Sequence, residues 1–193
     1  NWLPPDNSQL ALRVEVAQRT SPTNIGLWLT SALAAADFGY LTIDEFLLRL
    51  ERTLASLAKL ERYEGHFLNW YNTSTLLPLL PRYVSTVDSG NLLASFWVLR
   101  RGCEDLLHRP LVGHACLRGL QDTLSVLREA CGTDPLSNAP IQDLRRLLRR
   151  NVEGHHVVNR LLLGANAVQQ LKDIGRWRDP SDERTYWVLR IAQ

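Results

Sequence analysis

Apolar residues recur at helical spacing along most of the chain, whereas the alternating pattern of strands is scarce. The first such run follows Thr23, extends from Ile25 to Ala36 and stops near Gly39. The next begins with Thr42-Ile43-Asp44-Glu45, a capping box in which a hydroxyl and a carboxylate satisfy two backbone N–H groups. Leucines three and four residues apart then continue to Leu60. The pattern predicts two helices joined by a short turn.

A long stretch without helical spacing follows, from Glu64 to about Val87, and it is rich in aromatic residues. Loops of this length inside a compact domain are usually functional. Further helices are predicted from Ser89, as the cap, to about His108, from Gly113 to Cys131, from Ile141 to Arg150, from Val152 to Ile174, and after Pro180. The composition of Gly132–Pro140 is typical of a linker. We therefore expect an all-α chain of helical hairpins.

The composition is that of a globular protein, with 45% hydrophobic and 22% charged residues and a net charge of +2, which excludes a disordered chain. Three cysteines without short spacings predict a reducing compartment and no disulfide framework. The most apolar stretch, Ile25–Ala36, is shorter than the roughly 18 residues that a membrane span needs. Because methionine is absent even at the first position, we expect the 193 residues to be a piece of a longer chain.

Residues whose side chains could bind a ligand or take part in a reaction are concentrated in three non-helical segments: 19–24, 65–73 and 84–91. In an antiparallel array of hairpins these segments lie at the same end of the helices, so we expect them to converge. They bring together aromatic rings, short amides, hydroxyls, one arginine and one aspartate. Flat rings stack on the apolar faces of sugars, and amide, carboxylate and guanidinium groups bridge neighbouring hydroxyls. The convergence predicts a glycan site.

The same residues also have a purely structural interpretation as helix caps, a charge at a helix N-terminus and core aromatics: Thr23, Thr42, Ser89, Asp88, Trp70 and Tyr71. For any single residue this interpretation stays open. As a set they favour a site, because a core plug does not need Asn69, Asn72 and Arg19 beside it.

Four blocks of sequence, in order Asn1–Asn7, Arg19–Leu27, Gly65–Tyr71 and Tyr83–Leu92, resemble the cyclic β-1,2-glucan synthases. The resemblance covers about the first hundred residues and lies in the middle region of that family, which is related to glycoamylase-like domains. It implies an (α/α)6 toroid with the glycan across the loop-bearing end. It also implies a large membrane enzyme that polymerises glucose from UDP-glucose, closes the glucan into a ring by transglycosylation in this middle region, and adjusts chain length in a phosphorylase-like part.

The resemblance implies a substrate-lining role for five residues of the three segments: Arg19, Asn24, Trp70, Tyr71 and Asp88. The convergence of the segments adds three further substrate-binding candidates: Thr20, Asn69 and Asn91. The resemblance supplies no catalytic pair, since retaining glycosyl transfer needs two carboxyl groups roughly 5 to 5.5 Å apart. Asp88 is the one acidic residue within the three segments and thus the one catalytic candidate. The family's catalytic glutamates come from later in the region, so we expect the isolated chain to be inactive.

On this interpretation, residues 1–112 are the first hairpins of the toroid, and residues 113–193 are a helical extension or an inserted helical subdomain. The expected partners are a β-1,2-glucan chain and the remaining domains of the parent enzyme, with no cofactor. The expected location is the cytoplasmic side of the bacterial inner membrane, as part of a larger membrane protein.

The sequence offers two alternative sites, a metal site and a basic helix. Cys103, His108, His114 and Cys116 lie close in sequence, but they lack the close pairs of zinc modules and straddle a proline, so no metal is expected. A leucine stripe accompanies a basic face on the predicted helix with Arg145, Arg146, Arg149 and Arg150. That pattern suits a surface helix on an anionic lipid, although the low net charge favours a solvated face and argues against nucleic acid. The alternative function is thus a non-catalytic helical scaffold that docks weakly on lipid.

Overall fold

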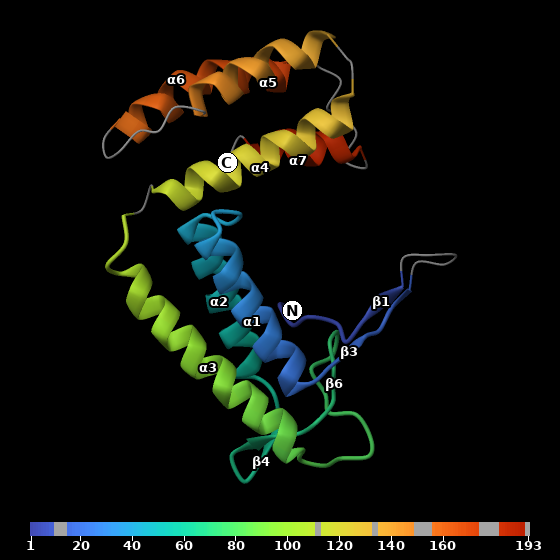
Figure 1. The fold of residues 1–193 in the computed structure, drawn as a ribbon. Helices are drawn as coiled ribbons and strands as arrows, with labels where there is room; N and C mark the ends of the chain where they lie inside the picture. Colours follow the sequence, from blue (N-terminus) through green and yellow to red (C-terminus); the bar gives the residue numbers. More distant parts are fainter. Residues whose placement is uncertain (10–14, 111–112, 133–134, 149–155, 174–181, 192–193) are drawn as a thin grey trace. The chain divides into compact units, whose positions relative to one another are not determined.

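The structure is a computed structural model that describes residues 1–9, 15–110, 113–132, 135–148, 156–173 and 182–191. Within these residues the chain forms seven α-helices and six strands of two residues each (Figure 1). The prediction of a mostly helical chain is confirmed. Two compact units are present, one made of Asn1–Ala36 and Leu41–Arg109, the other of Asp37–Tyr40 and Pro110–Gln193.

Three helices build the first unit: α1 (Pro22–Asp37), α2 (Ile43–Leu57) and α3 (Thr86–Leu106). Their apolar faces meet in one core, with Ile25 and Phe46 completely buried. Burial of a side chain of this size contributes roughly 1.5 to 3 kcal/mol. Close approach of α1 and α3 depends on Gly26, because a Cβ there would lie 2.5 Å from Ser95 Oγ. This close contact therefore fixes α1 against α3.

The start of α2 is the predicted capping box. The backbone N–H of Glu45 donates to Thr42 Oγ1 at 3.2 Å, and the N–H of Thr42 donates to the Glu45 carboxylate at 3.0 Å. The hydroxyl and the carboxylate each satisfy one N–H that the helix leaves without a partner. The prediction for this helix start is confirmed.

The caps of α1 and α3 lie earlier than predicted. The N-cap of α3 is Ser85, whose Oγ accepts from the N–H of Asp88 at 3.1 Å, so the prediction of Ser89 as the cap is wrong. At α1, Ser21 Oγ accepts from the N–H of Asn24 at 3.3 Å, which makes Thr23 a residue of the first turn. Both segments contain several hydroxyl residues, and at α3 it is Ser85 that has the extended backbone geometry of a cap.

The six strands form three antiparallel pairs: β1 (Ser8–Gln9) with β2 (Glu15–Val16), β3 (Arg19–Thr20) with β6 (Tyr71–Asn72), and β4 (Arg62–Tyr63) with β5 (His66–Phe67). Two of the pairs are local hairpins. The β3–β6 pair is different, since it joins the segment before α1 to the long loop after α2. It places Arg19 opposite Asn72 and Thr20 opposite Tyr71.

Four helices build the second unit: α4 (His114–Cys131), α5 (Pro135–Leu148), α6 (His156–Asp173) and α7 (Glu183–Ile191). Leu124, Leu127, Ile141 and Leu171 are completely buried in its core. The prediction of a linker over Gly132–Pro140 is wrong from Pro135 onward, because α5 already begins there. Proline suits the first position of a helix, where its missing N–H would have no partner.

We predict that Gly26→Ala destabilises the first unit by about 1 to 3 kcal/mol, because the new methyl group overlaps Ser95 across the α1–α3 contact. Gly90→Ala is the matched control on α3, since a Cβ at Gly90 meets nothing within 4 Å. That change should stabilise the helix by about 0.5 to 1 kcal/mol. Urea unfolding followed by tryptophan fluorescence measures both, and equal stability of the two variants would contradict the close packing.

Candidate functional site

The three segments predicted to converge do lie together in the first unit. The β3–β6 pair brings the segment before α1 against the long loop. The second turn of α3 joins them through Asn91, whose Nδ2 donates to Thr23 Oγ1 at 3.1 Å. Residues that are far apart in the sequence thereby form one polar network, which runs from Asp6 to Asp88.

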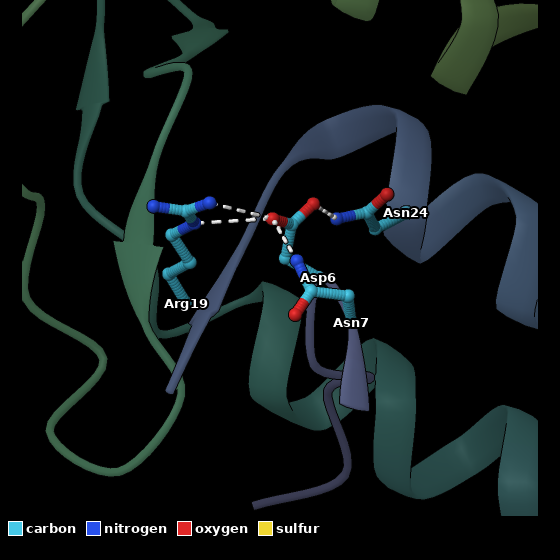
Figure 2. A network of polar contacts seen from close by, with 4 residues as sticks. All are labelled: Asp6, Asn7, Arg19 and Asn24. Carbon is cyan, nitrogen blue, oxygen red and sulfur yellow. Dashed lines mark hydrogen bonds and ion pairs between the residues drawn. The ribbon is translucent and has the colours of Figure 1, made fainter. Parts of the chain in front are cut away.

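One end of the network is centred on the Asp6 carboxylate (Figure 2). Arg19 donates to Asp6 Oδ2 from Nε at 3.1 Å and from Nη2 at 2.9 Å. Asn24, in the first turn of α1, donates to Oδ1 at 3.1 Å, and Asn7 donates to Oδ2 at 3.2 Å. The hydrogen bond from Asn24, followed by that from Arg19, lowers the pKa of Asp6, although partial burial opposes the shift. The carboxylate is therefore ionised at neutral pH, and both of its oxygens accept hydrogen bonds.

Arg19 also lies over an aromatic ring, with its guanidinium carbon 5.1 Å from the centre of the Trp70 ring. The Arg19 side chain is 51% exposed and Trp70 is half-buried, so both reach the surface of the unit. A guanidinium over an indole face is a cation–π contact. The pair presents hydrogen-bond donors beside an apolar ring.

The side chain of Asn69 forms a hydrogen bond with the indole N–H of Trp70. With its amide oriented to satisfy all three neighbours, its oxygen accepts from Trp70 Nε1 at 2.7 Å and from the Tyr83 hydroxyl at 2.8 Å. Its nitrogen donates to Asp88 Oδ2 at 2.8 Å. Asn69 is only 5% exposed, so its role in this structure is to orient Trp70.

The other end of the network is the carboxylate of Asp88. Burial raises its pKa, but hydrogen bonds from Ser85, from the hydroxyl and N–H of Thr23, and from Ser21 outweigh burial and leave the pKa below its usual value. Asp88 thus binds the first turns of both α1 and α3. A general acid needs a raised pKa, so this environment does not suit Asp88 to donate a proton.

Two of the predicted ligand contacts are completely buried. Tyr71 has no exposed surface, and its hydroxyl donates to the carbonyl of Glu61 at 2.6 Å and accepts from the N–H of Leu68 at 2.7 Å. Burial raises the pKa of Tyr71. Thr20 is equally buried. In this structure neither side chain has exposed surface with which to contact a ligand, so both act as core residues beneath the Arg19–Trp70 pair.

The residue that sequence reasoning missed is Asp6. It stands in the first of the four blocks that carry the resemblance, yet none of that block's residues was assigned to the site. A half-exposed arginine over an indole needs a carboxylate to fix it, and Asp6 is the acidic residue that the block offers. The presence of Arg19 among the predicted site residues could therefore have pointed to Asp6 as its partner.

The described residues give no support to the two alternative sites, the metal site and the lipid-binding basic helix. Among the residues that the structure describes, no three His, Cys, Asp or Glu side chains are grouped to hold a metal ion. Burial raises the pKa of the Cys103 and Cys116 thiols. On the basic helix, Arg146 pairs with Asp143 at 2.9 Å, whereas Arg149 and Arg150 lie outside the described residues.

Comparison with known proteins agrees with the resemblance seen in the four sequence blocks. No family model matches the chain. The similarity found among curated proteins is to a glucan synthase, the class of protein that the four blocks indicate. That relative is the cyclic beta-(1,2)-glucan synthase NdvB of Rhizobium meliloti (strain 1021), to which 155 residues, 80% of this chain, are 39% identical. The resemblance is therefore confirmed, and the chain spans 6% of the length of this relative.

The described helices were also compared with the dimensions of a bilayer. None of them combines the length and the apolar character that crossing a membrane requires.

We predict that stability of the first unit falls in acid, and that Asp88→Asn removes part of this dependence. The pKa of Asp88 is lowered by folding, so its contribution is present above the unfolded value of about 3.9 and is lost as pH falls through the folded value. At pH 7 the variant should lose about 0.5 to 2 kcal/mol, as for loss of a helix cap.

Urea unfolding between pH 2 and pH 7 measures this effect. The control is Glu51→Gln, an exposed position on α2 whose replacement should change stability by less than about 0.5 kcal/mol. An Asp88→Asn curve parallel to that of the wild type would show that the carboxylate does not join the two helices as described.

Proposed function

We propose that the chain is a segment of a cyclic β-1,2-glucan synthase, a glycosyltransferase, and that its first unit contributes glycan-binding side chains to the cyclising part. The support for the synthase is the 39% identity over 80% of the chain. The support for glycan binding is the pair of Arg19 and the half-buried Trp70, fixed by Asp6 where the three segments meet. Transglycosylation of linear β-1,2-glucan is the reaction that this part would serve.

The Arg19–Trp70 pair carries the proposal because it offers both kinds of contact that a sugar needs. An aromatic face packs against the C–H groups of a pyranose ring, and a guanidinium donates to two neighbouring hydroxyls. Asn24 lies beside the pair in the first turn of α1 and adds an amide at the same place. Few polar groups beside an apolar surface are typical of small-ligand sites.

The chemistry itself is proposed to reside elsewhere in the synthase. Retaining transfer requires one carboxyl group that donates a proton and a second that acts as nucleophile. Asp6 and Asp88, the two carboxylates of the network, both have lowered pKa values and both accept several hydrogen bonds. Such carboxylates orient their donors and stay ionised. The first unit therefore binds and positions the glucan chain.

The setting within the longer protein is also a proposal. The hairpins of the first unit would form part of an (α/α)6 toroid related to glycoamylase-like domains, and the second unit would be a helical extension or inserted subdomain. The partners would be the other domains of a synthase at the cytoplasmic side of the inner membrane. Docking on anionic lipid through the basic helix stays a prediction.

We predict that linear β-1,2-glucan produces a saturable change in the tryptophan fluorescence of the chain, and that Trp70→Ala weakens binding by about tenfold. The expected loss is that of one aromatic contact, since about 1.4 kcal/mol corresponds to a factor of ten. Trp97→Ala is the matched control, because Trp97 lies on α3 and is 68% exposed but stands outside the network. No saturable change with the wild-type chain would remove the proposal of glycan binding.

A second prediction concerns catalysis. The 193 residues alone should neither cyclise nor hydrolyse linear β-1,2-glucan, because the network holds no carboxyl group suited to donate a proton. Chromatography of the glucan after prolonged incubation with the purified chain measures both products. Ring formation or shortening of the glucan would place the catalytic carboxylates within this chain.

A further inference from the structure

Arg19 needs an external constraint to stay over Trp70. A long arginine side chain on the surface loses much rotamer freedom when it is held in one position. Here two donors of one guanidinium, Nε and Nη2, converge on the same oxygen of Asp6. Figure 2 shows the remaining amino group of Arg19 directed away from Asp6. The ion pair thus fixes the plane of the guanidinium and leaves one amino group outside the ion pair.

Asp6 is itself fixed from two sides. Its backbone N–H donates to the carbonyl of Arg19 at 2.7 Å, so the two residues are joined by backbone as well as by side chains. Its Oδ1 accepts from Asn24, which belongs to the first turn of α1. The Asp6 side chain is 20% exposed. The carboxylate is therefore a fixed support that is anchored to the helix.

The hydrogen bonds of Asp6 argue against direct contact with a ligand. A carboxylate has about four acceptor positions. In this structure Asp6 accepts two hydrogen bonds from Arg19, one from Asn24 and one from Asn7. Three of these hydrogen bonds end on Oδ2 and one, from Asn24, on Oδ1, so the oxygen that holds Arg19 has no acceptor position left for a sugar hydroxyl.

We propose that Asp6 is a positioning residue, which preorganises the Arg19–Trp70 pair to receive one glucose unit of a β-1,2-glucan chain. The proposal rests on the proposed glycan-binding function and adds the residue that holds the pair in place. Asp6 acts through Arg19 and makes no contact with the sugar. Preorganisation increases affinity because the arginine side chain is already ordered before binding.

The test is a double-mutant cycle with linear β-1,2-glucan as the probe. Asp6→Asn should weaken binding about five- to tenfold, the effect of leaving one long side chain to be ordered on binding. In an Arg19→Ala background, Asp6→Asn should have no further effect, because Asp6 acts through Arg19. Glu61→Gln is the matched control: it breaks the exposed ion pair of Glu61 with Arg82, outside the network, and should leave affinity unchanged.

A second measurement follows Arg19 directly. The Nε–H resonance of Arg19 in the NMR spectrum should be shifted by the ring current of Trp70, and Asp6→Asn should abolish this shift. Circular dichroism verifies that each variant is folded. If Asp6→Asn is unfolded, Asp6→Glu takes its place, since it keeps the charge but moves the carboxylate by one methylene.

Two results would overturn the proposal: an Asp6→Asn affinity equal to the wild type, or an equal loss with and without Arg19, which would make Asp6 a direct contact. If the wild-type chain binds no glucan, the proposed function fails. The NMR measurement then still decides the positioning step, because an Arg19 signal that is unchanged in Asp6→Asn would refute it.

Discussion

The carboxylate of Asp88 is the constraint on which the arrangement of the first unit depends. It belongs to the first turn of α3, yet it accepts hydrogen bonds from Thr23 and Ser21 at the start of α1. Both helix N-termini carry partial positive charge, so one anion stabilises two helices at once. Through Asn69 the same carboxylate orients the indole of Trp70, over which Arg19 lies. A change at Asp88 therefore reaches the Arg19–Trp70 pair through Asn69.

The helices were predictable because their signals are local. The apolar spacing of α1 and the capping box of α2 involve residues within one or two turns of each other, and both are present as expected. The convergence of the three segments was predictable for a different reason, since antiparallel hairpins bring alternate loops to the same end. The candidate residues Arg19, Asn24 and Trp70 lie together on this basis.

The features that the sequence did not reveal depend on which partner a residue finds at a distance. The hydroxyl of Tyr71 is satisfied by two backbone groups of its own loop, so an aromatic expected at the surface is buried instead. Ser85 and Ser89 are equivalent candidates for a cap until the backbone geometry selects one. Asp6 acquires its role only when the β3–β6 pairing places Arg19 beside Trp70. No pattern within a short stretch of sequence shows which distant partner each of these residues will have.

The network also has a consequence for the order in which the chain folds. Its contact between Asn91 and Thr23 joins residues 68 positions apart and so requires closure of a long loop, whereas the backbone hydrogen bonds of a helix join residues four positions apart. Local helices form quickly, whereas contacts of high sequence separation form late. During synthesis α1 and α2 can form before α3 is made, but the support of Trp70 is incomplete until the first turn of α3 arrives. The surface around Arg19 is then among the last parts of the unit to become ordered.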